Sequence, residues 1–237
     1  MADSKPVTQK TTPSRSPLVR VVEALEAFYG RPKRPSVRDP FEQILWENLA
    51  YLASDERRSQ AWKHFRARVG TKPAQVLAAP RALLMEIGQA GIMPAGSANK
   101  VQESATIAME EFGGSLKPVL KLPLKDAKKA LRKFPSIGEP GAEKILLFAG
   151  SHAVLALDSN GLRVLRRLGF GRDDKNYTKS YRSAQEAVAP GLPLDTAWLT
   201  EAHQLLRRHG QELCKTNHPR CDACPLKKDC AYYTSIA

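Results

Sequence analysis

The feature that most constrains the fold of this chain is a succession of amphipathic segments with helical periodicity, which runs from residue 18 to residue 210. Most of these segments end at Gly or Pro, the residues that stop helices. In one of them the apolar residues recur at the spacing of a single helix face: Ala142, Ile145, Leu146 and Ala149. Strand-like alternation is nearly absent, and its best example, VLAL at 154–157, is short. The sequence therefore predicts an all-α fold.

The charge of the chain is strongly unbalanced. Its 237 residues include 37 Lys and Arg but only 24 Asp and Glu, which gives a net charge of +13. Such a surplus favours a polyanionic partner, nucleic acid or an anionic membrane surface, over the alternative of a merely basic soluble protein. No apolar run approaches the ~18 residues that span a bilayer, and the N-terminus has no apolar signal core. We expect no membrane association and a cytoplasmic, nucleoid-associated location in a prokaryote or a nuclear one in a eukaryote.

Basic residues gather in three stretches, at 117–133, at 163–172 and around the C-terminal cysteines. A solvated helix face is the usual explanation of any one such run. Because all three flank the same cysteines and the same turn at 135–138, we expect them to share a face that contacts DNA.

Near the C-terminus lie four cysteines: Cys214, Cys221, Cys224 and Cys230. In a reducing compartment such a group is expected to bind metal and not to form disulfides. Zinc sites with four cysteines usually consist of two C-x-x-C pairs, whereas here one such pair is flanked by single cysteines at unequal distances. The spacing favours a [4Fe-4S] cluster, in which each iron takes one thiolate, over the alternative of zinc.

Two stretches of the sequence resemble one known family. The segment CKTNHPRCDACPLKKDC at 214–230 is similar, in its cysteine spacing, to the iron–sulfur loop of the endonuclease III and adenine-glycosylase branch of the helix-hairpin-helix DNA glycosylases. Residues 134–138, FPSIG, resemble that family's hairpin, L-P-G-hydrophobic-G. The resemblance extends over about residues 18–235. It implies two helical lobes, a helix-hairpin-helix lobe and a cluster lobe, with a DNA-binding cleft between them.

The chain is expected to divide into four parts. Residues 1–17, rich in Ser, Thr, Pro and Lys, predict a disordered basic tail. By the resemblance, an N-terminal helix in residues 18–35 packs with the iron–sulfur cluster lobe, 152–237, whose cluster loop is 214–230. Residues 36–151 form the lobe that ends in the hairpin. We expect a monomer that binds double-stranded DNA containing a lesion or a mismatch.

The resemblance also implies which residues touch DNA. In the family, backbone N–H groups of the hairpin hold one phosphate at the positive end of the second helix. The matching residues here are Ile137, Gly138, Glu139, Pro140 and Gly141. Basic residues of the cluster loop contact further phosphates, which assigns Lys215 and Arg220 and leaves His218 as either a contact or a plain exposed residue. Tyr51 and Leu52 fall where relatives insert side chains into the base stack, although the family usually has Gln nearby.

Two acids are candidate catalytic residues. Asp158 would cap the helix that begins at Ser159. In the resembled family a stretch of the form VD.n..RV..R follows the hairpin at this distance, and its Asp is catalytic. The matching residues here are Asp158, Asn160, Arg163, Val164 and Arg167. A fixed carboxylate can stabilise the oxocarbenium-like sugar that forms when an N-glycosidic bond breaks. Glu47 falls where adenine and mismatch glycosylases carry an acid that can protonate the leaving base, with an exposed helix residue as the alternative.

One expected catalytic group is missing. Family members that also cut the DNA backbone carry a nucleophilic lysine at the second residue after the hairpin's last glycine, and that residue here is Pro140. Lys144 lies on the same helix face, about 6 Å further along the axis, but a lysine of a basic protein is usually solvated. We therefore expect a monofunctional DNA glycosylase of base excision repair, without lyase activity. The alternatives are a DNA-binding protein that has lost catalysis and a bifunctional glycosylase/AP lyase of the endonuclease III type with an unexpected amine.

Overall fold

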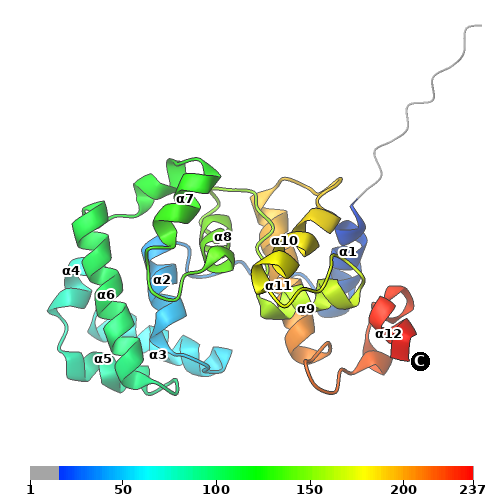
Figure 1. The fold of residues 1–237 in the computed structure, drawn as a ribbon. Helices are drawn as coiled ribbons and strands as arrows, with labels where there is room; N and C mark the ends of the chain where they lie inside the picture. The colour runs from blue at the N-terminus through cyan, green and yellow to red at the C-terminus, as the bar shows by residue number, and fades with distance from the viewer. Residues whose placement is uncertain (1–15, 237) are drawn as a thin grey trace, which may run out of the picture.

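A computed structural model describes residues 16–236, which form only helices and loops (Figure 1). The prediction of an all-α fold is confirmed over this range. The helices up to the hairpin are α1 (Pro17–Tyr29), α2 (Pro40–Leu49), α3 (Asp55–Arg68), α4 (Pro73–Ala78), α5 (Arg81–Gly88), α6 (Pro94–Phe112), η1 (Lys117–Lys121), α7 (Leu124–Leu131) and α8 (Glu139–Phe148). Those after it are α9 (Ser159–Arg167), α10 (Tyr177–Val188), α11 (Thr196–Glu212), η2 (Cys221–Ala223), η3 (Lys227–Asp229) and α12 (Ala231–Ile236).

The two ends of the described range bear on two expectations. The predicted disordered tail, 1–17, lies outside the described residues except for its last two. Those two are ordered, because Ser16 is buried and caps α1, which begins at Pro17. No helix in residues 16–236 combines the length and the apolar character that crossing a membrane requires.

Capping residues determine where the helices that carry the site begin. Asp39 precedes α2, and its Oδ1 accepts hydrogen bonds from two backbone N–H groups of the first turn, at 3.0 and 3.2 Å. Pro40 follows at the first helical position, where its fixed φ suits a helix. Ser54 caps α3 in the same manner as Asp39 caps α2. The short loop between α2 and α3 therefore enters α3 at a fixed point.

Two hydrophobic clusters form the core, one in each half of Figure 1. The first contains residues of the successive helices from α2 through α8. The second contains residues of α1, α9, α10 and α11. Helix α8 contributes to both, since Ile145 and Leu146 pack in the first cluster and Leu147 in the second. Successive helix residues point about 100° apart, so α8 lies at the junction with different faces buried in the two lobes. The domain boundaries expected from the sequence stay a prediction.

A buried carboxylate joins the lobes beside that helix. Glu143 of α8 is 3% exposed. One of its oxygens accepts a hydrogen bond from Lys128 Nζ at 2.7 Å, and the other accepts from Tyr181 OH at 2.5 Å and Gln185 Nε2 at 2.9 Å, both on α10. The buried charge is tolerated because it is paired and fully hydrogen-bonded. Burial and the neighbouring Glu143 carboxylate raise the pKa of Tyr181 well above its ordinary value.

Replacing Tyr181 with Phe should weaken this junction. The variant removes one hydrogen bond to the charged Glu143, and such bonds contribute about 1.5–3 kcal/mol to stability. We expect the free energy of unfolding in urea to fall by about this amount. Tyr177→Phe, on an exposed part of the same helix, is the matched control and should change it by less than about 0.5 kcal/mol. Equal stability of the two variants would contradict the assignment.

Candidate functional site

Asp158 stands at the start of α9, where the two lobes face each other. As the sequence predicts, it caps the helix, because its Oδ1 accepts a hydrogen bond from Gly161 N at 2.7 Å. Its Oδ2 accepts from Asn160 Nδ2 at 3.1 Å and lies 3.4 Å from Arg207 Nε. The side chain is still 25% exposed. The carboxylate is thus held in one orientation and stays reachable, while its catalytic role stays a prediction.

Glu47 and Lys144 form an ion pair across the same cleft. The Oε1 of Glu47, on α2, lies 2.6 Å from the Nζ of Lys144, on α8, and both side chains are largely covered, at 25% and 20% exposure. The expectation of a solvated Lys144 is therefore wrong. Burial alone would raise the pKa of Glu47, but the Lys144 ammonium, helped by Arg58 and Arg207, outweighs it and holds this pKa below its usual range.

A histidine that the sequence reading missed lines the same pocket as Glu47 and Lys144. His203 of α11 is buried and its Nδ1 bonds to the backbone carbonyl of Ala156 at 2.9 Å. Burial lowers the pKa of His203 to about 4, and the nearby Asp158 only partly opposes the shift. His203 lines one pocket together with Lys144 and Arg207, and Asp158 lies 3.4 Å from Arg207. The ring is neutral at pH 7.

A pocket that is open to solvent extends from His203, Lys144 and Arg207. Its wall includes two aromatic side chains, Trp46 of α2 and Phe148 of α8, together with Glu47, Lys144 and Arg207. Pockets that bind planar ligands combine apolar walls with a few fixed polar groups. The pocket therefore places the Glu47 carboxylate and the Lys144 amine beside a space with aromatic walls.

The turn at 135–138 places a residue other than glycine in the left-handed region of backbone conformation. Ser136 replaces a glycine and has φ +63°, in the left-handed region. Ile137 is buried and its N–H already bonds to the carbonyl of Phe134 at 3.2 Å. Pro140 has no N–H, which leaves Gly138, Glu139 and Gly141 to present free backbone donors at the start of α8.

The negative charge of Glu139 at this turn is balanced by two basic side chains. It pairs with Lys128 Nζ at 2.9 Å and with Arg182 Nη2 at 3.1 Å. The hydrogen bond from Lys128, with that from Arg182, holds the pKa of Glu139 below its usual value against the effect of burial. The first turn of α8 thus keeps its positive end available although it contains an acid.

Two touching loops carry exposed apolar side chains. Tyr51 and Leu52 are 48% and 68% exposed, as a wedge into the base stack would need, and Leu52 has φ +56°. The second loop was missed by the sequence reading: its Ile92 and Met93 are exposed too, and Ile92 N donates to Tyr51 O at 3.1 Å. Gly91 permits this approach, because a Cβ there would lie 2.6 Å from Tyr51 N. The signal available in the sequence was two apolar residues between Gly and Pro.

The four cysteines line one small pocket. All four are free thiols, and within residues 16–236 no set of three or more His, Cys, Asp or Glu is close enough for a single metal ion. Zinc draws four thiolates to about 2.3 Å from one centre, whereas a [4Fe-4S] cluster holds them further apart around its irons. The donor set therefore fits the cluster better than zinc.

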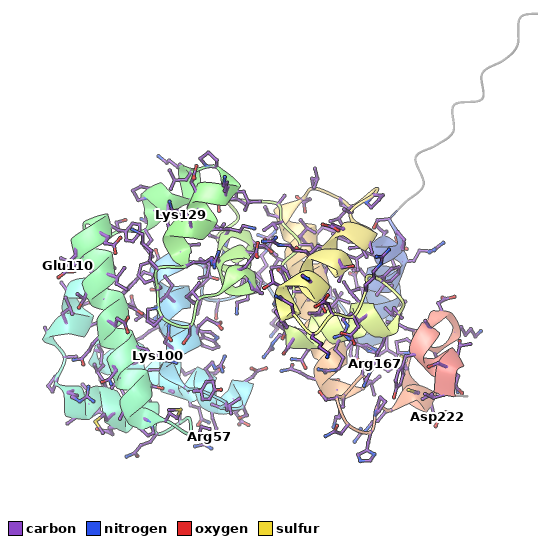
Figure 2. The ribbon with its side chains drawn as sticks, viewed as in Figure 1. Arg57, Lys100, Glu110, Lys129, Arg167 and Asp222 are labelled. Atoms are coloured by element: carbon purple, nitrogen blue, oxygen red, sulfur yellow. The ribbon has the colours of Figure 1, made fainter. Side chains whose placement is uncertain are left out.

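Polar side chains contact two of these cysteine sulfurs. Arg167, at the cluster end of α9 in Figure 2, places Nη1 3.4 Å from the sulfur of Cys214. On the opposite side His209 Nε2 lies 3.5 Å from the sulfur of Cys224, and Tyr29 OH lies 3.0 Å from the other ring nitrogen. The loop residues expected to touch DNA are exposed: Lys215, His218 and Arg220.

Comparison with known proteins gives a consistent set of relatives, although no family model matches the chain. Endonuclease III of Rickettsia conorii is 36% identical over 110 residues, 46% of this chain and 48% of that protein. Endonuclease III of Thermotoga maritima is 27% identical over 202 residues, 85% of this chain and 87% of that protein. The match thus spans about half the length of the first of these relatives and most of the second.

A solved structure shows the same fold. It is a trapped covalent intermediate of endonuclease III with DNA, it superposes with a TM-score of 0.73, and it covers 92% of this chain and 96% of its own at 20% identity. These relatives contradict the expectation of a monofunctional enzyme, because endonuclease III is a bifunctional glycosylase/AP lyase. The expectation rested on Pro140 at the family's lysine position and on a solvated Lys144, whereas Lys144 is largely covered and lines the cleft.

The neutral His203 should make stability depend on pH. Its pKa is about 4 in the folded protein and about 6.5 when unfolded, so the unfolded chain takes up its proton first as the pH falls. The free energy of unfolding should decrease from pH 6.5 to pH 4, by up to about 3 kcal/mol from this group. Urea unfolding under anaerobic conditions should show a shallower pH dependence for His203→Gln than for the parent protein. His218→Gln, at an exposed site, should keep the parent slope, and a His203→Gln slope equal to it would refute the assignment.

Proposed function

We propose that this chain is a member of the endonuclease III branch of the helix-hairpin-helix DNA glycosylases, which its sequence relatives and the shared fold support. It would remove a damaged or mismatched base from double-stranded DNA and then cleave the backbone at the abasic site. The observation that carries this proposal is the amine of Lys144, which is 2.6 Å from the Glu47 carboxylate in the cleft that also holds Asp158. Removing a base requires that the nucleotide leave the stack, and the pocket beside these groups can receive it.

Lys144 can replace a lysine at position 140 because of the geometry of helices. Side chains on an α-helix lean toward its N-terminus, so a residue covers the surface over the preceding turn. Pro140 lies one turn before Lys144 and has a short side chain. The long Lys144 side chain can therefore supply an amine over that turn, where a lysine at 140 would supply one.

The ion pair supplies both groups that the chemistry needs. Transfer of one proton from Nζ of Lys144 to Oε1 of Glu47 gives a neutral amine and a protonated carboxyl, with no change in total charge. The amine can then attack C1′ of the sugar while Glu47 returns the proton to the departing base. In this mechanism the low pKa of Glu47 in the ion pair describes the resting state, and Glu47 becomes the acid only after it accepts the lysine proton.

Asp158 would act on the sugar. Its carboxylate, fixed by Gly161 N and Asn160 Nδ2, can stabilise the positive charge that develops at C1′ as the base leaves. The C1′–O4′ bond of the adduct then breaks, with one proton passing from the Lys144 nitrogen to O4′. The protonated imine that this leaves between C1′ and Nζ makes the C2′ proton acidic. Loss of that proton breaks the bond to the 3′ phosphate, and water then releases the amine.

The remaining contacts position the DNA. Backbone N–H groups of Gly138, Glu139 and Gly141 would hold a phosphate at the start of α8. Lys215 and Arg220 would contact others, and Tyr51 and Leu52 would fill the gap that the extruded base leaves. We propose that the protein acts as a monomer, in the nucleoid of a prokaryote or the nucleus of a eukaryote.

The proposal includes a [4Fe-4S] cluster held by the following ligands: Cys214, Cys221, Cys224 and Cys230. The cluster would supply structure and no step of the reaction, by fixing the loop that carries the basic residues. Arg163 supports the same loop from α9, because its Nε donates to Cys214 O at 2.9 Å and its Nη2 to Gly210 O at 2.7 Å.

A duplex with a single abasic site tests the lyase step without knowledge of the excised base. The full-length protein should break it without alkali, and borohydride should trap a covalent adduct by reducing the imine. Lys144→Met should lower both yields at least about 100-fold, a typical loss for a removed nucleophile, while the Kd for the duplex changes little. Lys63→Met, on the exposed face of α3, is the matched control. Undiminished cleavage and trapping by Lys144→Met would exclude this lysine as the nucleophile.

A further inference from the structure

Arg207 of α11 contacts one carboxylate from each lobe. Its Nη2 lies 2.6 Å from Oδ1 of Asp55, the first residue of α3, and its Nε lies 3.4 Å from Oδ2 of Asp158. Asp55 belongs to the lobe of the hairpin, whereas Arg207 and Asp158 belong to the lobe of the cysteines. The guanidinium is thus a direct polar connection between the two sides of the cleft.

The choice of arginine matters for this connection. Nε and Nη2 form one edge of the guanidinium, an edge that usually binds a single carboxylate through two parallel hydrogen bonds. Here the edge is divided between Asp55 and Asp158. A lysine presents a compact point charge and not a rigid fork, so it would not hold two carboxylates from opposite sides in fixed directions. The hydrogen bond from Arg207 also keeps the pKa of Asp55 below its usual range, against the effect of burial.

Asp55 follows directly after the loop that carries the exposed Tyr51 and Leu52. Ser54, the last residue of the loop, caps α3. Arg58, one turn into α3, donates from Nη2 to Ala50 O at 3.2 Å. These contacts join the loop and the first turn of α3 into one unit. A displacement of the loop would therefore move Asp55 and, with it, the guanidinium that touches Asp158.

The neighbouring Arg208 has its described partners within one lobe. Arg208 pairs with Glu212 on its own helix at 2.8 Å and covers the ring of Tyr29, both in the lobe of the cysteines. Arg207 and Arg208 are adjacent in one basic stretch of the sequence, which does not distinguish them. Only the fold assigns them different partners, and Arg208 is consequently a matched control.

We propose that Arg207 is a positioning residue that couples the 51–54 loop to the carboxylate of Asp158. While the loop is seated, Asp55 holds the guanidinium and the guanidinium holds Asp158 in the orientation that faces the sugar. Displacement of the loop removes the guanidinium and leaves Asp158 held by Gly161 N and Asn160 Nδ2 alone, so its carboxylate keeps this orientation less tightly. The effect on catalysis rests on the proposed function of Asp158, whereas the coupling between the lobes does not.

Hydrogen–deuterium exchange measures the coupling without any activity. In the full-length, cluster-containing protein, Asp55→Asn on one lobe should increase amide exchange at the start of α9, residues 159–161, on the other lobe. Arg207→Ala should increase it at both α9 and α3, whereas Arg208→Ala should leave both unchanged. Unchanged exchange at α9 in Asp55→Asn would overturn the proposal, and this surface variant keeps the test decisive if Arg207→Ala folds poorly.

Single-turnover kinetics measure the consequence for catalysis. On a duplex whose base the parent protein excises, Arg207→Ala should slow base release at least tenfold with a Kd for DNA within about threefold of the parent, and methylguanidinium at matched ionic strength should restore part of the rate. A merely structural role would give no such rescue, so its absence would overturn the positioning role. A parent protein that releases no base but shows the exchange coupling would refute the proposed function and leave the coupling intact.

Discussion

The proposed chemistry of this cleft depends on one ion pair, between Glu47 of α2 and Lys144 of α8. Two charges that are largely withdrawn from water stabilise each other, and removing either would leave the other buried and unpaired. The pair therefore keeps a primary amine inside the cleft, where a solvated lysine would not stay. It also joins the proposed nucleophile and the proposed acid in one hydrogen bond, so in the proposed mechanism a single proton shift prepares both.

Helix α8 brings the separate tasks of the site together. Its first turn presents backbone donors to a phosphate, its middle carries Lys144 and the buried Glu143, and its two faces pack in different hydrophobic clusters. In the proposed complex, a phosphate bound at the first turn and the amine of Lys144 one turn later are separated by a rigid rise of about 1.5 Å per residue. The proposed position of the DNA relative to the amine then depends on the helix and not on a loop.

Part of this could be predicted from the sequence. Periodicity and helix stops predict the all-α fold, and the position of Asp158 before a helical stretch predicts its cap, because both depend on residues close together in the chain. The ion pair could not be predicted in this way, since Glu47 and Lys144 meet only through packing of α2 on α8. The same holds for Arg207, which the sequence does not separate from Arg208, and for the loop of Ile92 and Met93 that lies against Tyr51.

The proposal that Lys144 is the nucleophile is tested by identifying the amino acid that becomes covalently attached to the DNA. The full-length protein is incubated with abasic-site DNA, reduced with borohydride and digested, and the modified peptide is sequenced by mass spectrometry. We predict that the reduced sugar remnant is attached to Lys144, within the sequence GAEKILLF. A remnant on another lysine or on the N-terminal amine would contradict it, because the ion pair of Lys144 with Glu47 would then not supply the nucleophile.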